Sequence, residues 1–137
     1  MSEDFLELPV AFMNEDHAEF VEALAGLEAL LEAGDLEAVG PAFEALLTHT
    51  REHFGREEAA MRQIQFPPYQ AHKGEHDRVL GVLEQILAQW QAAPDVQKMR
   101  EYIEDMRGWF HQHLDTMDRV TSVWLARNGI EQAPVEG

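Results

Sequence analysis

Residues 42–64, AFEALLTHTREHFGREEAAMRQI, place apolar side chains at intervals of three and four residues. This spacing is typical of an amphipathic helix whose apolar stripe faces a core. The stripe also contains His53 and Glu57, at positions where leucine is expected. Because a buried imidazole or carboxylate is costly without a partner, other parts of the chain must supply groups that meet these two side chains.

Three further helices are predicted on either side of this stretch. Breaks in the periodic pattern occur at AGD (33–35), FPP (66–68) and AAPD (92–95), which leaves helices at roughly 11–33, 37–64, 69–91 and 96–127. Short connections between long helices make neighbours antiparallel. The sequence therefore predicts an all-α fold, an antiparallel up-down-up-down four-helix bundle with a short N-terminal arm and a C-terminal tail.

Length and composition agree with one bundle rather than several domains, since 137 residues suit a single core and we expect one domain over 1–137. The chain has no cysteine, which excludes disulfides and thiolate metal sites. Its formal net charge of −16 argues against binding to nucleic acid or to an anionic membrane, whose phosphates require lysine and arginine.

The N-terminus, MSEDFLELP, is acidic and lacks the apolar run of a signal peptide. No stretch approaches the roughly 20 apolar residues of a membrane span. We therefore expect a cytoplasmic protein without a membrane partner, present as a monomer or a weak homo-oligomer.

Every predicted helix carries histidine in its inward-facing stripe, which we call the seam. His17 lies in the first seam, His53 in the second, His72 and His76 in the third, and His113 in the fourth. Isolated histidines of this kind are usually hydrogen-bonded core residues. Histidines in all four seams call for a common explanation.

The seam polar residues are predicted to lie at one height in the bundle. His17 and His53 are each 18 residues from the first turn at residue 35, and Glu57 and His76 are 10 and 9 residues from the second at 67. His113 is about 20 residues beyond the third turn, and His76 about 17 before it. At about 1.5 Å per residue these mismatches amount to one helical turn or less.

The fourth helix places its carboxylate less favourably. Asp118 follows His113 by five residues, which is about 140° around an α-helix, so we expect it to reach the site from the flank. The seam itself is predicted to comprise Met99, Ile103, Met106, Phe110, His113, Met117, Val120 and Trp124.

Five imidazoles and two carboxylates at one height indicate a buried metal centre, because unpaired they would cost many kcal/mol. Seven ligands exceed the four that zinc prefers, and they suit two ions that share bridging carboxylates. Nitrogen and oxygen ligands without thiolate favour iron. The candidate ligands are His17, His53, Glu57, His72, His76, His113 and Asp118. His49 and His111 point elsewhere and are predicted to lie at the surface or outside the ligand set.

Four segments carry a resemblance to a known family: DHAEF (16–20), HFGREEAAM (53–61), HKGEH (72–76) and WFHQHLDTMD (109–118). In order and spacing they resemble the hemerythrins, in particular the single-domain bacterial hemerythrin-like proteins. The resemblance covers nearly the whole chain, and the ordered set of four is far more specific than any one segment.

The resemblance implies a non-haem di-iron protein that binds dioxygen reversibly as hydroperoxide, for transport, storage or scavenging, rather than an enzyme. It implies that His72, His76 and His113 ligate one iron, and that His17 and His53 ligate the other, which keeps an open position. Glu57 and Asp118 would bridge the two ions together with an oxo or hydroxo group. The apolar oxygen pocket would be lined by Phe54, Trp109, Phe110 and Leu114.

Other functions remain open at this point. A di-iron enzyme, an iron-storage or repair protein, or a sensor could use the same ligands to react with peroxide or nitric oxide. HKGEH also matches the H-x-x-E-H pattern of some zinc hydrolases, but that interpretation leaves five of the seven candidate ligands unexplained.

Overall fold

The computed structural model describes residues 8–130, so residues 1–7 of the expected arm and 131–137 of the expected tail lie outside the described range. The helices are α1 (Ala11–Ala33), α2 (Leu36–Gln63), α3 (Tyr69–Ala92), α4 (Val96–His113), a π-helical turn η1 (Leu114–Asp118) and α5 (Arg119–Arg127). The described residues contain no strand. The predicted all-α four-helix bundle is confirmed.

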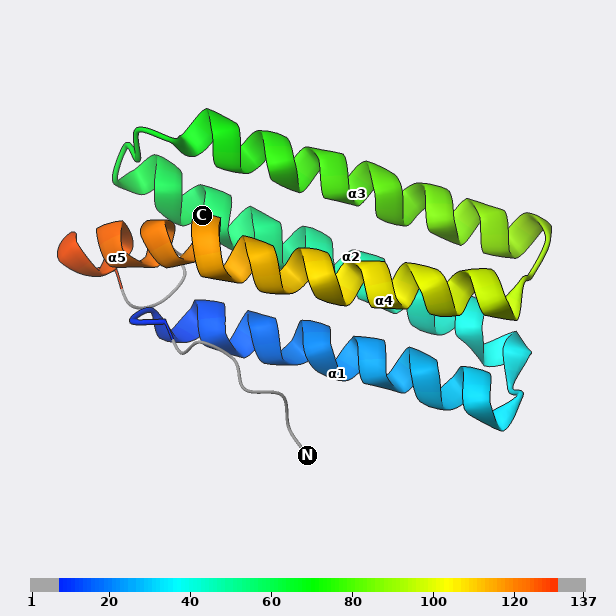
Figure 1. Cartoon of the computed structure of the whole chain (residues 1–137). Coiled ribbons are helices and arrows are strands. Elements are labelled where there is room, and N and C mark those ends of the chain that lie inside the picture. Colours follow the sequence, from blue (N-terminus) through cyan, green and yellow to red (C-terminus); the bar gives the residue numbers. More distant parts are fainter. Residues whose placement is uncertain (1–7, 131–137) are drawn as a thin grey trace.

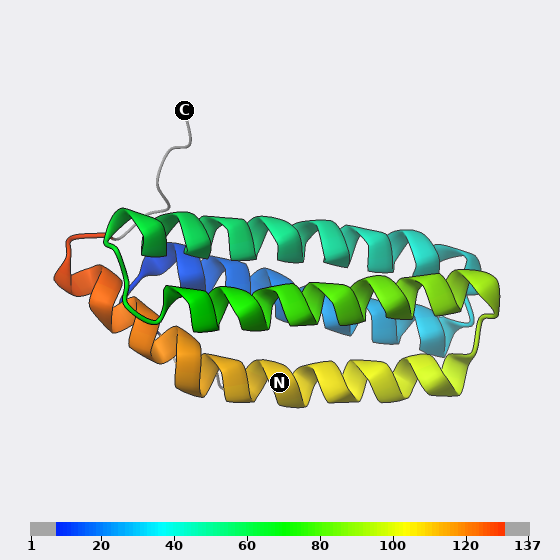
Figure 2. The ribbon, with the colours of Figure 1, turned by 90° about the horizontal axis from the view of Figure 1, so that it is seen from above.

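The four long helices run side by side, each antiparallel to the next along the chain (Figure 1). Helix α2 packs against α1 and α3, and α4 closes the bundle against α1 and α3. Figure 2 shows α5 bending away from the axis of α4, across the end of the bundle where α2 passes into α3. No helix within residues 8–130 has the length and apolar content needed to span a membrane.

Local sequence accounts for the helix ends. Gly34 ends α1 with a left-handed φ of 73°, a conformation that costs glycine little, and its N–H bonds back to Leu31 O at 3.2 Å. Asp95 caps α4 by accepting the backbone N–H of Lys98 at 3.1 Å. These caps set the short connections that keep the helices adjacent.

The bundle has an apolar half and a polar half. The apolar half, around the α1–α2 and α3–α4 turns, contains most of the large buried hydrocarbon side chains. They are Leu24, Leu27, Leu31, Phe43, Leu46, Leu83, Ile86, Trp90, Met99 and Ile103. Burial of each such side chain stabilises the fold by about 1.5–3 kcal/mol. The other half buries the candidate ligands, so the apolar half must carry much of the folding free energy.

The prediction of an uninterrupted α-helix over 96–127 was wrong. The turn η1 inserts one extra residue, so the inward-facing positions after His113 shift by one. Val120 and Trp124, expected in the seam, are 48% and 41% exposed, whereas Thr121 and Leu125 are fully buried. The expected seam residue Met117 is partly exposed, and its neighbour Asp118 is buried. A π-helical turn accommodates about one residue more than an α-helical turn, which explains the shift.

Candidate metal centre

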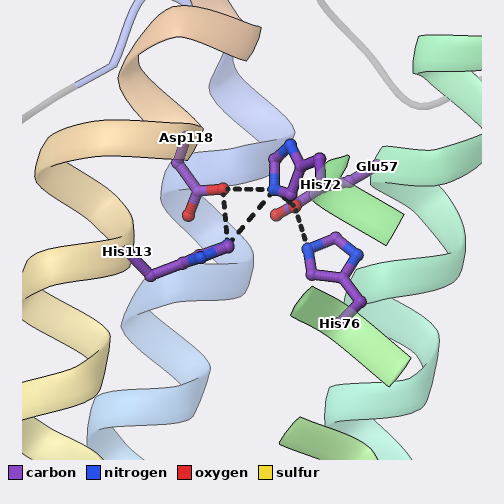
Figure 3. Close-up of side chains that lie close together, drawn as sticks. All are labelled: Glu57, His72, His76, His113 and Asp118. Atoms are coloured by element: carbon purple, nitrogen blue, oxygen red, sulfur yellow. Dashed lines mark hydrogen bonds and ion pairs between the residues drawn. The ribbon is translucent and has the colours of Figure 1, made fainter. Parts of the chain in front are cut away.

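Three imidazoles converge in the polar half of the bundle. His72 and His76 lie one turn apart on α3, and His113 is the last residue of α4 (Figure 3). The Nε2 atoms of His72 and His113 are 3.2 Å apart. All three rings are buried, with at most 5% of each residue exposed. Their Nε2 atoms therefore face a common point inside the bundle.

Two buried carboxylates meet these imidazoles. Asp118 Oδ1 lies 3.2 Å from His72 Nε2 and 3.1 Å from His113 Nε2. Glu57 Oε1 lies 3.3 Å from His76 Nε2 and 3.7 Å from His72 Nε2. An ion with bonds of about 2.0–2.1 Å holds neighbouring ligand atoms about 3.0–3.4 Å apart, so this spacing is close to that of a filled coordination shell.

His17 on α1 approaches the same carboxylates from their other side. Its Nε2 lies 3.0 Å from Asp118 Oδ2 and 3.9 Å from Glu57 Oε2. Each carboxylate thus turns one oxygen toward the three-histidine group and the other toward His17. This division of oxygens is what two neighbouring ions with shared carboxylates require.

His53 is placed differently from the other candidate ligands. Its ring lines a small cavity together with His17 and Glu57, but its Nε2 atom lies 3.3 Å from Glu19 Oε2 and 3.8 Å from Asp16 Oδ1. The structure therefore brings six of the seven predicted residues into one connected group, with His17 joined to it through Glu57 and Asp118. It leaves the seventh at the edge of the group, directed toward α1.

The π-helical turn explains why Asp118 joins the group directly. Five residues separate it from His113, and the wider turn brings both side chains onto one face, 3.1 Å apart. The expected approach from the flank was therefore wrong. An α-helix would have placed Met117 on this face and left the centre without its second carboxylate.

Polar groups outside the cluster orient two of the rings. His72 Nδ1 lies 2.8 Å from Thr121 Oγ1, and His76 Nδ1 lies 2.9 Å from Glu58 Oε2. When Nδ1 carries the proton it donates these bonds and leaves Nε2 free to bind a metal, the usual arrangement around metal-ligating histidines. Neither partner was predicted from the sequence. Thr121 was missed because η1 shifts the seam by one residue. Glu58 was missed because it lies outside the predicted seam of its helix.

The electrostatics of the cluster without an ion are unfavourable. Burial, together with the charge of Asp118, raises the pKa of Glu57 to about 8. Burial also tends to raise the pKa of Asp118. Hydrogen bonds from His113, His17 and His72 outweigh this effect and hold the pKa of Asp118 well below its usual value. Two neighbouring buried carboxyl groups cannot both ionise cheaply, so a bound cation would relieve the repulsion between them.

Unsatisfied atoms in the cluster fit a metal better than they fit a hydrogen-bond network. Glu57 Oε1 and His76 Nε2 are buried 3.3 Å apart, yet within the described residues neither atom has a hydrogen-bond partner. A buried atom left this way costs about 1–3 kcal/mol, and a bound cation would remove that cost. The ligand set thus fits a pair of metal ions that prefer nitrogen and oxygen ligands.

A small apolar cavity adjoins the His17 side of the cluster. Of the predicted pocket residues, Phe54, Trp109 and Phe110 line it, whereas Leu114 is buried but does not line it. Phe20 and Thr50 complete the wall, and neither was predicted there from the sequence. The cavity measures about 20 Å³, which is room for roughly one water-sized molecule.

Aromatic contacts hold this wall in place. Phe54 stacks on His76 with ring centroids 3.8 Å apart, and Trp109 stacks on His113 at 4.7 Å. The indole N–H of Trp109 donates to Glu75 Oε2 at 2.8 Å. The apolar wall is therefore packed directly against two of the candidate ligands.

His49 and His111 lie outside the cluster, on exposed faces of α2 and α4. His49 Nδ1 is 3.6 Å from Glu52 Oε1 and 4.0 Å from Glu19 Oε2. His111 contacts the ring of Phe110 edge to face at 6.2 Å. Both histidines therefore contact residues other than Glu57 and Asp118.

A family model and two related sequences all match this chain, and all three belong to the same family. The family model "Hemerythrin HHE cation binding domain" matches residues 8–124. A bacteriohemerythrin of Ralstonia nicotianae is 35% identical over 90% of this chain and 87% of its own length. A bacteriohemerythrin of Aquifex aeolicus is 27% identical over 83% of this chain and 88% of its own length.

A solved structure agrees on the fold. The crystal structure of a wild-type hemerythrin superposes with a TM-score of 0.81, covering 92% of this chain and 98% of that one at 22% identity. At such an identity the likeness concerns the arrangement of helices alone.

Proposed function

The chain belongs to the hemerythrin family, and from that premise we propose that it binds dioxygen reversibly at a pair of iron ions held by the buried cluster. One observation carries the proposal above the others. Glu57 and Asp118 each present one oxygen to the three-histidine group and the other to His17. Two carboxylates so divided support two adjacent ions, whereas a single ion needs no such arrangement.

In this proposal the two ion positions differ in their ligands. His72, His76 and His113 would hold one iron, His17 and His53 the other, and Glu57 and Asp118 would bridge them. His53 would join by turning its ring from Glu19 toward the cavity that it already lines. The position with two histidines has fewer protein ligands, so it would keep a site open to the cavity.

Iron supplies the chemistry, since a pair of ferrous ions can give up one electron each to dioxygen and recover it on release. The chain's own contribution is the surroundings. The small cavity admits only a very small molecule, and the walls of Phe20, Phe54 and Phe110 keep bulk water away from it. Neutral imidazoles outnumber carboxylates in the ligand set, which gives a less anionic site than carboxylate-rich di-iron enzymes have. Such a shell favours binding over oxygen cleavage.

The proposal is tested by reconstituting the protein with ferrous iron under anaerobic conditions and recording its absorption spectrum. We expect two irons per chain and a ligand-to-metal absorption band that appears on aeration and disappears on removal of oxygen. Iron binding without a reversible band would contradict oxygen carriage. Steady turnover of peroxide or nitric oxide would then favour the alternative, a di-iron enzyme or iron-handling protein. Zinc without iron would contradict the di-iron centre altogether.

A further inference from the structure

A second group of metal-ligating side chains gathers between α1 and α2, on the outer side of His53. His49 and His53 are four residues apart on α2 and so leave the same face of the helix. Asp16 and Glu19, three residues apart on α1, face them. Side-chain atoms of Asp16, Glu19 and His53 lie within 4.8 Å of one another. We call His49, Glu19, His53 and Glu52 the outer cluster.

The carboxylate of Glu19 lies between the two imidazoles. Its Oε2 atom is 3.3 Å from His53 Nε2 and 4.0 Å from His49 Nδ1, and Glu52 Oε1 is 3.6 Å from the same Nδ1. A tetrahedral ion with bonds of about 2.0–2.1 Å holds its ligand atoms about 3.3–3.4 Å apart. The Glu19–His53 distance already matches this value, the Glu52–His49 distance exceeds it by about 0.2–0.3 Å, and the Glu19–His49 distance exceeds it by about 0.6–0.7 Å. Rotations of the exposed side chains of Glu19, His49 and Glu52 can close these gaps.

Access and charge both favour a cation here. About half of each side chain of His49, Glu19 and Glu52 is exposed, whereas His53 is buried behind them. Asp16 accepts two hydrogen bonds from Arg56, and the charge of the same guanidinium also acts on Glu19 and Glu52. Three carboxylates face this one cationic side chain, so net negative charge remains. Two imidazoles and two carboxylates suit a divalent transition-metal ion better than calcium or magnesium, which prefer oxygen ligands alone.

His53 connects the outer cluster to the buried one. Its Nε2 atom faces Glu19, yet its ring also lines the cavity that contains His17, Glu57 and Asp118. Rotation of the His53 side chain would therefore move its Nε2 atom from the outer cluster to the buried one.

We propose that His49, Glu19 and His53, with Glu52 alongside, form an outer binding site for a divalent transition-metal ion, and that ferrous iron reaches the buried centre through it. The step exchanges ligands only, and the iron remains ferrous throughout. Binding at the outer cluster stands on its own geometry, whereas the loading role rests on the proposed di-iron function.

Binding is tested on the metal-free full-length chain with Zn²⁺, which has no redox chemistry of its own. Histidine ring signals are followed by nuclear magnetic resonance during the titration, and the His49 signal is assigned from its loss in His49→Ala. We expect the Nδ1 signal of His49 to shift on Zn²⁺ binding, and Glu19→Gln to weaken that binding at least tenfold. The matched control is Glu22→Gln, which removes one carboxylate from the same exposed side of α1 and should leave the affinity unchanged. A His49 signal that stays in place while the buried histidines shift would overturn the outer site.

The loading role is tested by the rate of ferrous iron uptake under anaerobic conditions, normalised to the final iron content of each variant. We expect His49→Ala and Glu19→Gln to slow uptake at least threefold relative to Glu22→Gln. Equal rates in all three variants would overturn the role in loading. A wild-type chain that takes up no iron while Zn²⁺ still shifts the His49 signal would contradict the di-iron function and leave the outer site standing.

Discussion

The rings of His72 and His76 illustrate how single residues set the geometry of the centre. Each has one nitrogen engaged by a polar neighbour, Thr121 or Glu58, and the other directed into the cluster. Fixed tautomers lower the cost of ordering the ligands when metal binds. The chemistry of the centre would therefore depend also on residues that do not touch a bound ion.

His113 is predicted to be indispensable to the centre, because its Nε2 atom contacts both His72 and Asp118. We expect His113→Ala to weaken iron binding at least tenfold, measured by metal analysis after gel filtration. The control is His111→Ala, since His111 lies on the exposed side of the same helix and should not affect iron content. Equal iron in wild type and His113→Ala would remove His113 from the ligand set.

Phe110 is predicted to control access to the proposed open iron position. Its ring stacks on Phe20 at 5.0 Å and meets the edge of His17 at 5.4 Å, so it forms part of the cavity wall. We expect Phe110→Leu to enlarge the cavity and to speed oxygen release or autoxidation several-fold, because water enters more readily. Stopped-flow spectroscopy measures both rates. Loss of iron in this variant would mean that Phe110 supports the ligands rather than the pocket.

At the scale of elements, η1 is a local departure from α-helical geometry that changes which side chains face the core. Without it, Asp118 would leave the centre and Val120 would replace Thr121 in the core. Turns of this kind are frequent at functional sites because they re-aim side chains without breaking the helix.

Deletion of exposed Thr116 is predicted to be tolerated. It removes the extra residue, and Asp118 would then follow His113 by four positions, as an α-helix requires for the same face. We expect the variant to retain iron and most of its thermal stability. Deletion of exposed Arg119 is the matched control, since it leaves Asp118 five positions after His113 while Thr121 and Leu125 move one position closer. Asp118 and the pair Thr121 and Leu125 then cannot all face inward, so iron content or stability should fall. If both deletions behave alike, the shift in register does not explain the burial pattern.

An ion pair that joins α1 to α4 provides a test of pH dependence. Both guanidinium NH₂ groups of Arg107 donate to Glu28, at 2.6 and 2.5 Å, and these bonds lower the pKa of Glu28 from its usual 4.5. A depressed pKa stabilises the fold above pH 4.5, and the contribution is lost as the pH falls through the folded pKa.

We expect Glu28→Gln to lower the free energy of unfolding by about 0.5–1 kcal/mol at pH 7, a small value because Glu28 is partly exposed to solvent. The difference from wild type should shrink as the pH falls below 4.5. Urea titrations of the metal-free protein at several pH values measure it. A difference that is constant from pH 7 to pH 3 would exclude the charge of Glu28 as its cause.

At the scale of the whole molecule, burial of the ligand side chains in the polar half costs folding free energy. A bound metal would offset this cost. Removal of iron should therefore lower the thermal stability. Binding at a thousandfold excess over the dissociation constant contributes about 4 kcal/mol, which corresponds to a shift on the order of 10 °C in Tm for a domain of this size. Calorimetry of the iron-loaded and chelated protein tests this, with chelator added to metal-free protein as the control. Identical Tm values would mean that the centre contributes nothing to the fold.

The sequence by itself determined the four helices and the group of polar residues that the bundle encloses. Both follow from periodicity, which is a local property. Residues three and four apart share a helix face, and short turns bring equivalent heights together. Five of the six predicted ligands that lie together do so for that reason, whereas the sixth, Asp118, depends on η1.

Only the tertiary structure decided what depends on packing between helices. The extra residue in η1 cannot be predicted from an α-helical period, because it is stabilised by the burial of Asp118, Thr121 and Leu125 against the other helices. The direction of the His53 ring is likewise decided by a contact between α1 and α2, made with Glu19, which the sequence did not single out. Periodicity selects the face of a helix, whereas the orientation of a side chain on that face is set by the neighbours it meets.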